Sequence, residues 1–329
     1  MLLPALAELV DDKVWLAPLA GVTDKAFRAV CKRMGADVMV SEMVSADGLL
    51  HKPAPSLANA RFDDSQRPFG IQLFGSRPDI MARALDVVLP LRPDFIDVNM
   101  GCPVKKVVNR GAGSALMREP QRAADIVRAM KNALAGAGLP LSVKFRSGWD
   151  THSVNAVEFG LRMQEAGADI LVLHARTRTQ MYGGKADWAL IAALALAVDV
   201  PVVGNGDIWE PEDVDDMRRQ TGCSAVMVGR GVMGRPWLFA QIARFRLTGQ
   251  ADVISCKLKV ECIRDHYRMT MADKGEVTAM KEMRSHLAWY TKGYAGGAAV
   301  RRLVNRSDDR EEALAAVEAL LLTQETDGS

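Results

Sequence analysis

Eight short apolar runs recur between residues 14 and 228, each separated from the next by a segment with helical patterning. The runs have the length of strands: Val14–Ala17, Val38–Val40, Gly70–Leu73, Phe95–Val98, Leu141–Phe145, Ile170–Leu173, Pro201–Val203 and Ala225–Val228. Parallel strands need crossover connections, which helices usually supply. Eight strand–helix units in a row predict an α/β fold, a closed (β/α)8 TIM barrel, with an open doubly wound sheet as the alternative.

The pattern changes after Leu247. Three helical segments, Ser255–Ala272, Ala279–Lys292 and Glu311–Thr323, follow a short linker near Thr248–Asp252, with no strand candidate between them. The chain has 329 residues, and a TIM barrel typically uses about 250. We therefore predict a catalytic barrel over residues 1–247 and a small all-helical domain over residues 248–329.

Composition excludes several classes of protein. The chain is 49% hydrophobic and 25% charged, as in ordinary globular proteins. Its apolar runs fall short of the ~20 residues that a membrane span needs, and the N-terminus lacks the basic segment of a signal peptide. The five cysteines are scattered without a C-x-x-C pair, which argues against a disulfide framework and a zinc site. We expect a cytoplasmic protein with no metal, no membrane contact and no obligate protein partner.

Charge is unevenly distributed along the chain. Residues 257–306 hold 11 basic and 5 acidic residues, whereas residues 307–329 hold 1 basic and 7 acidic residues. A basic helical segment of this kind either contacts phosphates or forms a solvated helix face.

Five of the apolar runs have a polar side chain at or just after their C-terminal end: Gln72, Asn99, Lys144, His174 and Asn205. In a parallel barrel the C-terminal ends of the strands meet at one mouth. Buried polar groups are costly unless they are paired. Five of them together predict a ligand site or a hydrogen-bonded network.

Two glycine-containing loops follow the seventh and eighth runs. They are Gly204-Asn205-Gly206-Asp207 and Gly229-Arg230-Gly231. This corner of a barrel is a common phosphate site, because glycines permit close backbone approach and helix N-termini present free N–H groups. Arg230 could add a charge-assisted bond. The alternative is a pair of simple turns.

Cys102 and Lys144 are the candidate reactive groups. Cys102 lies in Asn99–Pro103, before a loop with basic residues. A thiol with an ordinary pKa near 8.5 is mostly protonated at neutral pH and can act as an acid; as a nucleophile it would need a base, for which His174 is the candidate. Lys144 could form a Schiff base or place its charge beside an electron-rich cofactor ring.

Seven sequence motifs carry a resemblance to a known enzyme family. They are Ala17–Asp24, Ser41–Met43, Asp97–Pro103, Val143–Trp149, His174–Arg178, Gly204–Asp207 and, near the C-terminus, Arg284–Tyr290. Together they resemble the tRNA-dihydrouridine synthases, and the last motif is similar to the bacterial B-type branch. The resemblance covers nearly the whole chain.

The resemblance implies an enzyme with tightly bound FMN, reduced by NADPH, that transfers hydride to C6 of a uracil in tRNA. Cys102 matches the general acid that protonates C5, and Asn99 and Arg176 match substrate-binding positions. The positions that match contacts to the isoalloxazine ring are Pro18, Leu19, Ala20, Gln72 and Lys144. Those that match ribityl or phosphate contacts are His174, Asn205, Gly206, Asp207, Gly229 and Arg230. Leu19 stands where methionine is usual, a change of little volume.

A base must be turned out of its stack to reach a flavin at a barrel mouth. The basic loop after Cys102 and the basic helical segment could then bind the surrounding phosphates. Three alternatives remain at this point: a flavin oxidoreductase acting on a free pyrimidine or another small molecule, a Schiff-base aldolase that uses Lys144, and a non-catalytic RNA-binding protein.

Overall fold

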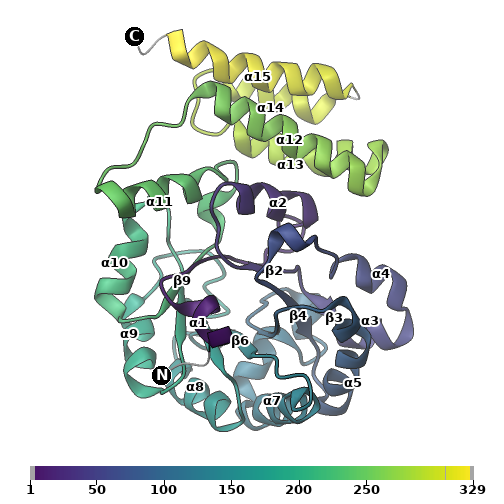
Figure 1. The fold of residues 1–329 in the computed structure, drawn as a ribbon, viewed down its shortest axis with the longest axis vertical. Helices are drawn as coiled ribbons and strands as arrows, with labels where there is room; N and C mark the ends of the chain where they lie inside the picture. The colour runs from purple at the N-terminus through teal and green to yellow at the C-terminus, as the bar shows by residue number, and fades with distance from the viewer. Residues whose placement is uncertain (1–3, 308, 327–329) are drawn as a thin grey trace. The chain divides into compact units, whose positions relative to one another are not determined.

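The computed structural model describes residues 4–307 and 309–326 (Figure 1). The described residues form two compact units. The first, here called the barrel unit, consists of residues 4–20, 37–208 and 212–229. The second, the helical unit, consists of residues 21–36, 209–211 and 230–326, without residue 308.

The barrel unit is built on one parallel sheet. Its strands are β1 (Val14–Leu16), β2 (Met39–Val40), β3 (Val44–Ser45), β4 (Phe69–Phe74), β5 (Phe95–Met100), β6 (Leu141–Arg146), β7 (Ile170–His174), β8 (Val202–Asn205) and β9 (Ala225–Val228). The order is β1-β9-β8-β7-β6-β5-β4-β2, and β3 pairs with β4. A parallel bridge from Trp15 to Val38, with the Leu16 N–H donating to the Val38 carbonyl at 3.0 Å, closes the circle. The predicted (β/α)8 barrel is confirmed.

Helices connect these strands around the outside (Figure 1). They are α3 (Ala46–His51), α4 (Pro53–Ala58), η1 (Asp64–Gln66), α5 (Pro78–Val88), η2 (Leu89–Leu91), α6 (Lys105–Val108), η3 (Gly113–Arg118), α7 (Pro120–Leu134), α8 (Ala156–Glu165), α9 (Trp188–Ala197) and α10 (Glu212–Thr221). Helix α7 shows why they form: Pro120 occupies its first turn, where a missing N–H costs little, and Ala123, Ile126, Val127 and Met130 make its buried face.

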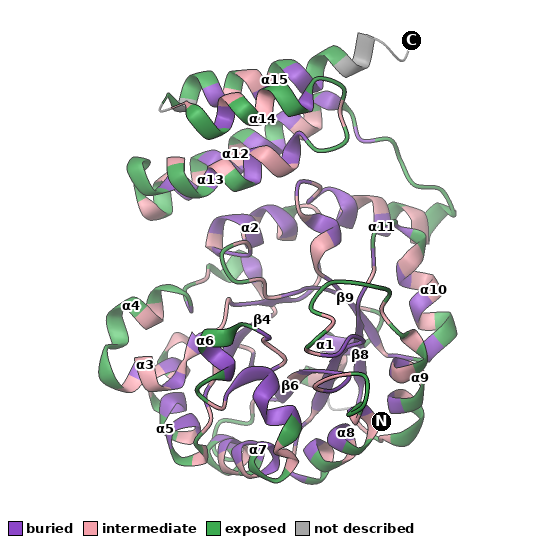
Figure 2. Ribbon diagram, turned by 180° about the vertical axis from the view of Figure 1, so that it is seen from behind, coloured by how far each residue is buried: buried purple, intermediate pink, exposed green. Residues whose placement is uncertain are grey.

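The interior of the barrel is apolar toward the N-terminal ends of the strands. Trp15, Phe95 and Val172 belong to one buried cluster with Leu9 and Val10 of helix α1 (Pro4–Val10). The Trp15 indole N–H donates to the Leu9 carbonyl at 2.7 Å and so fixes α1. The buried interior is visible in Figure 2. Because this end is filled with apolar side chains, the polar groups of the strands are left for the opposite end.

The helical unit contains seven helices among its described residues: α2 (Lys25–Arg33), η4 (Arg230–Val232), α11 (Leu238–Thr248), α12 (Cys256–Lys274), α13 (Glu276–Tyr290), α14 (Gly297–Arg306) and α15 (Arg310–Thr326). The predicted C-terminal helical region is therefore present, with α14 as an additional helix. Val30 of α2 and Trp237 share one buried core with Ile263, Met283 and Val317. Segments before residue 248 thus belong to the helical unit, and the boundary at 247/248 stays a prediction.

Candidate active site

The five predicted polar residues lie at the C-terminal ends of neighbouring strands. Strand register pairs Asn99 of β5 with Lys144 of β6, and His174 of β7 with Asn205 of β8. Gln72 of β4 pairs in register with residue 97 of β5, two positions before Asn99. The structure therefore gathers all five at one mouth of the barrel.

A chain of hydrogen bonds runs from Asp97 to the Cys102 loop. Gln72 donates from Nε2 to Asp97 Oδ2 at 2.6 Å and accepts from Asn99 Nδ2 at 2.8 Å. Asn99 Oδ1 then accepts from the backbone N–H groups of Gly101, at 3.2 Å, and Cys102, at 2.9 Å. A carboxylate only accepts hydrogen bonds, so Asp97 determines which way both amides face.

Asp97 is a site residue that sequence reasoning missed. Its side chain is 1% exposed and accepts a hydrogen bond from Ser142 as well as from Gln72. Burial raises the pKa of this carboxyl to about 6, against these two hydrogen bonds and the charge of Lys144, which lower it. The signal was available in the sequence: Asp97 lies two residues before Asn99 on one strand, and period two places both on the same face.

Cys102 is the accessible cysteine of the chain. Its side chain is partly exposed, whereas the other four cysteines are buried. The backbone N–H and the hydroxyl of Ser114 donate to its carbonyl at 3.0 and 2.9 Å, which fixes the loop from the other side. Burial raises the pKa of the Cys102 thiol, while the charges of Arg146 and Lys144 oppose the shift. The thiol therefore keeps its proton at neutral pH, as a general acid requires.

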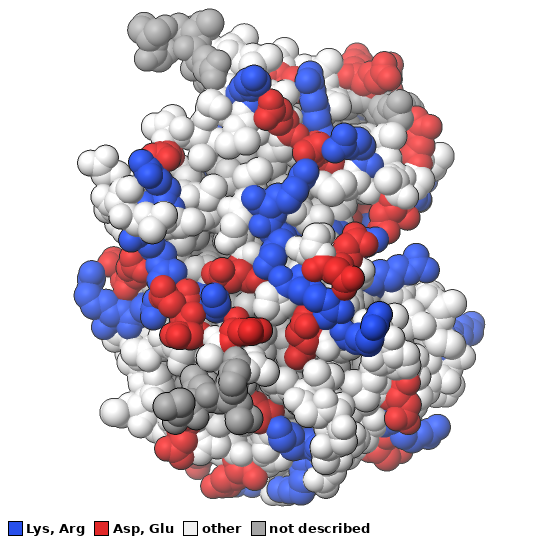
Figure 3. All heavy atoms as spheres, viewed as in Figure 1, with Lys and Arg blue, Asp and Glu red and all other residues white. Residues whose placement is uncertain are grey.

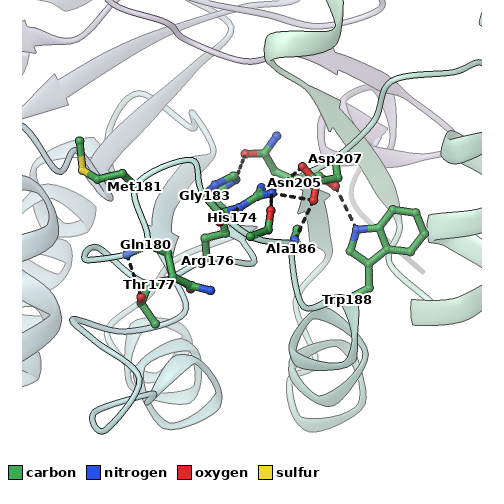
Figure 4. Close-up of polar contacts among 12 residues, drawn as sticks. His174, Arg176, Thr177, Gln180, Met181, Gly183, Ala186, Trp188, Asn205 and Asp207 are labelled. Carbon is green, nitrogen blue, oxygen red and sulfur yellow. Dashed lines mark hydrogen bonds and ion pairs between the residues drawn. The ribbon is translucent and has the colours of Figure 1, made fainter.

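Lys144, His174 and Asn205 form the second polar group of the mouth. Figure 4 shows His174 and Asn205. Asn205 Nδ2 donates to the Met227 carbonyl at 2.7 Å, so its Oδ1 faces His174 Nδ1, at 2.9 Å, and Lys144 Nζ, at 3.4 Å. Because an amide oxygen only accepts, His174 carries its proton on Nδ1. Its Nε2 is then a buried acceptor with no partner among the described residues.

Burial and neighbouring positive charges lower the pKa values of both His174 and Lys144. Burial lowers the pKa of His174 well below its ordinary value, and the charges of Lys144, Arg146 and Arg176 lower it further. Burial also lowers the pKa of Lys144 to about 8, with a further contribution from Arg146. At neutral pH His174 is therefore uncharged, and most Lys144 side chains keep a proton.

Arg176, the second predicted substrate-binding residue, is held by an ion pair at the mouth of the barrel. Its side chain is 2% exposed and its Nη2 donates to both carboxylate oxygens of Asp207 at 2.7 Å. It also donates to the carbonyls of Gly183, at 3.0 Å, and Gly184, at 2.7 Å. Arg176 therefore joins the loop after β7 to the loop after β8 (Figure 4). Its Nη1 is buried and has no partner among the described residues.

The predicted phosphate corner is formed by backbone. Gly206 has φ +134° and Asp207 has φ +56°, conformations that turn the chain sharply after β8. Asp207 also accepts from the Ala186 N–H at 2.7 Å. A Cβ on Gly229 would meet only Ala17 Cβ, at 3.7 Å, so this backbone is open to a ligand.

The segment of Pro18, Leu19 and Ala20 follows β1 at the same mouth. The Ala17 N–H donates to the Val228 carbonyl of β9 at 2.8 Å, so this segment starts beside Gly229. Arg230 begins η4 and belongs to the helical unit, where its guanidinium lies 5.1 Å from the ring centroid of Trp209.

Arg146 is a second residue that sequence reasoning missed. It donates from Nε to the Gly101 carbonyl at 2.9 Å and from Nη1 to the carbonyls of Thr177 and Met181 at 3.0 and 2.9 Å. It therefore joins the Cys102 loop to the loop after β7. Arg146 lies two residues after Lys144, on the same face of β6, so strand periodicity was the available signal.

No group of three or more His, Cys, Asp and Glu side chains in residues 4–307 and 309–326 is arranged to hold a metal ion. Within the same residues, no helix combines the length and apolarity needed to cross a membrane.

Comparison with known proteins places this geometry in a family. The family model described as dihydrouridine synthase (Dus) matches residues 15–325. The chain belongs to this family. It is 38% identical over 307 residues to tRNA-dihydrouridine synthase B of Xanthomonas axonopodis pv. citri, covering 93% of this chain and 92% of the relative. The corresponding protein of Pseudomonas aeruginosa is 35% identical over 321 residues, covering 97% and 96%.

A third relative comes from Synechocystis. It is named probable tRNA-dihydrouridine synthase 1 and is 40% identical over 297 residues, covering 89% of this chain and 81% of the relative. Family membership, with relatives named as B-type enzymes at 35–38% identity, confirms the resemblance seen in the sequence motifs.

Solved structures with low sequence identity share the fold. A 2-naphthoyl-CoA reductase complex with 2-naphthoyl-CoA matches with a TM-score of 0.54 at 11% identity, covering 70% of this chain and 50% of the other. A morphinone reductase variant in complex with tetrahydroNAD matches with a TM-score of 0.53 at 9% identity, covering 76% and 90%. These likenesses support the barrel fold alone.

Proposed function

We propose that this enzyme reduces specific uridines of tRNA to 5,6-dihydrouridine, with FMN as the bound cofactor and NADPH as the reductant. The observation that carries the proposal is the mouth of the barrel: a protonated thiol, Cys102, and an ammonium, Lys144, stand among polar strand ends in a chain of the dihydrouridine synthase family. The names of the curated relatives support tRNA as the substrate.

The residues present fit a flavin. His174 Nε2 is a buried acceptor that lacks a donor, and buried acceptors normally have one. Lys144 Nζ has one long hydrogen bond, 3.4 Å to Asn205, which leaves donors for a ligand. Gly206 and Gly229 supply backbone without side chains at the common phosphate corner of barrels.

Twelve residues are proposed to hold the flavin or the uracil around Cys102. Those for the isoalloxazine ring are Pro18, Leu19, Ala20, Gln72 and Lys144; those for the ribityl chain and phosphate are His174, Asn205, Gly206, Asp207, Gly229 and Arg230; Asn99 is proposed to bind the uracil. When bound, FMN supplies hydride chemistry, accepting two electrons from NADPH and delivering them to C6 of the uracil. Arg176 is proposed to support the substrate pocket through the loop it holds.

Cys102 completes the reduction by giving its proton to C5 of the uracil. Hydride at C6 and a proton at C5 together saturate the C5–C6 bond, and the thiolate left behind regains a proton from solvent. The raised pKa of Cys102 keeps the proton on sulfur until the base accepts it. Asn99 fixes the loop through the Gly101 and Cys102 N–H groups, which holds the sulfur in place for this transfer.

Lys144 is proposed to favour the reduced flavin electrostatically. A positive charge beside a cofactor ring stabilises the negative charge that the ring gains on reduction. The pKa of Lys144, about 8, leaves the amine charged at neutral pH. Gln72 and Asn99 have their amide orientations set by Asp97, so they present fixed donors and acceptors to bound ligands.

Visible absorbance of the purified protein tests the proposal. We expect a yellow protein that bleaches with NADPH and regains its colour on addition of unmodified tRNA. The variant Cys102→Ala should bleach at the same rate and bind tRNA, but should regain colour at least about a hundredfold more slowly, the usual contribution of a general acid.

Two of the alternatives predict different results. Colour that returns with free pyrimidines and not with tRNA would identify a small-molecule flavin reductase. A protein that FMN cannot turn yellow would refute the flavin assignment and favour Schiff-base chemistry at Lys144.

A further inference from the structure

Two arginine side chains contact the indole ring of Trp149. The guanidinium carbon of Arg118 lies 3.9 Å from the ring centroid, and that of Arg178 lies 4.6 Å from it. Arg118 ends η3, Trp149 follows β6 and Arg178 follows β7. Three segments at the C-terminal mouth therefore converge on one aromatic ring, and none of these three residues has a role in the proposed function.

Backbone hydrogen bonds hold this cluster together. The Arg178 N–H donates to the Gly148 carbonyl at 2.9 Å, which joins the loops that carry Arg178 and Trp149. Asn155 Nδ2 donates to the Met117 carbonyl at 2.9 Å, which joins η3 to the loop after β6. Contact with the ring restrains both guanidinium groups before any ligand arrives, so a ligand would lose little side-chain entropy by binding them.

The two arginines are not matched by acidic side chains. Among the described residues neither guanidinium has a carboxylate within 4.0 Å, and Arg178 Nε is buried without a hydrogen-bond partner. Arg128 of the adjacent helix α7 is different, because it pairs with Asp125 at 2.8 Å. Basic and acidic side chains also intermingle over the face shown in Figure 3. Arg118 and Arg178 thus differ from Arg128, because their charges are not neutralised by a nearby carboxylate of the described residues.

An anion with several acceptor oxygens fits such a pair. The guanidinium fork matches a phosphate geometrically, and an ammonium does not. The segment η3 begins beside the proposed acid, because the Ser114 N–H donates to the Cys102 carbonyl at 3.0 Å. A phosphate bound by Arg118 and Arg178 would therefore belong to the strand whose uridine enters the mouth.

We propose that Arg118, Trp149 and Arg178 form a binding site for a backbone phosphate of the RNA, adjacent to the uridine that is reduced. This inference rests on the proposed function. Trp149 acts as a support that orients the two guanidinium groups, and the buried Nε of Arg178 gains its missing acceptor. A site of this kind fixes the register of the RNA without reading its sequence.

The test is the salt dependence of tRNA binding by the flavin-loaded protein. Binding is measured by fluorescence anisotropy, with a fluorescently labelled tRNA that carries no modified nucleosides. Arg118→Gln and Arg178→Gln should each weaken binding roughly tenfold at 0.15 M salt. Each should also lower the slope of log K against log salt by about one, because one cationic contact to the RNA backbone is lost. Arg128→Gln removes the same charge from a paired arginine and should change affinity by less than about twofold.

A conservative variant separates charge from geometry. Arg178→Lys should keep the salt slope and still lose affinity, because lysine retains the charge without the planar fork. Arg118 is exposed, so its variant tests the site even where changes at Arg178 disturb the loop.

Three results would overturn the inference. Wild-type affinity and slope in both glutamine variants would remove the phosphate site while leaving the proposed function intact. A higher KM for NADPH in flavin reduction, with unchanged tRNA binding, would reassign the pair to the phosphates of the reductant. If the unaltered protein itself fails to bind tRNA, the proposed function fails, and the inference fails with it.

Discussion

Replacement of Asp97 by asparagine should change how stability depends on pH. Burial raises the pKa of this carboxyl from 3.8 to about 6. The folded protein therefore binds a proton at Asp97 between about pH 4 and pH 6 that the unfolded chain has already released. Stability falls with rising pH wherever the folded state binds more protons. The favourable contribution of protonated Asp97 is thus complete below pH 4 and lost as the pH rises through about 6.

The magnitude follows from the size of the shift. A difference of about two pKa units corresponds to about 3 kcal/mol, and no discount for solvent applies because Asp97 is 1% exposed. Asp97→Asn keeps the shape of the side chain and removes its titration. Relative to this variant, the wild type should lose about 3 kcal/mol of unfolding free energy between pH 4 and pH 7.

Urea unfolding followed by circular dichroism, at half-unit pH steps and equal flavin content, measures this difference. Groups whose titration does not depend on the Asp97 charge cancel between the two proteins, and any fixed change in hydrogen bonding shifts the difference without giving it a slope. In the wild type Lys144 titrates near pH 8, above the window, and its pKa is lower in the variant because the Asp97 charge raises it. A difference that varies by less than about 0.5 kcal/mol across the window would refute the raised pKa of Asp97 and the ionic network built on it.

Three further outcomes are expected. A thiol reagent should label one cysteine of the native protein, and Cys102→Ala should abolish labelling, because the other four cysteines are buried; peptide mapping identifies the site. Arg176→Met should destabilise the protein by about 3 kcal/mol in urea unfolding, because it removes a guanidinium that is 2% exposed and pairs with the Asp207 carboxylate. The rate of flavin reduction by NADPH should fall as the pH rises through about 8, because Lys144 loses its charge there. In Lys144→Met the rate should be lower and should not change over this pH range. A stopped-flow instrument measures both rates.

The eight main strands were predictable because each must be apolar to lie inside a barrel. The polar residues at the strand ends were also predictable, because Lys144 and His174 stand out in segments that are otherwise apolar. Strand β3 has two residues and makes no pattern that periodicity can detect. Residues 21–36 of the helical unit were assigned to the barrel because their packing against residues far along the chain leaves no mark on local sequence.

The partners of individual side chains could not be predicted. Gln72 meets Asp97 because β4 and β5 pair in one register, and a shift of one residue would have turned one of them away. The substrate role of Arg176 is implied by the family resemblance and stays a prediction. Its partner Asp207 is 31 residues away, and the local sequence does not predict that pairing.

The distribution of unpaired buried atoms argues where ligands bind. Among the described residues of the barrel unit, four buried side-chain atoms lack a hydrogen-bond partner: Asn155 Oδ1, His174 Nε2, Arg176 Nη1 and Arg178 Nε. Folded proteins leave few such atoms unsatisfied, because each costs free energy. Three of the four lie within residues 174–178, at the end of β7 and just after it, beside Asn205 and Asp207, whose side chains are hydrogen-bonded. The unpaired atoms of this segment therefore support the two proposals made above, flavin beside His174 and a phosphate of the RNA beside Arg178.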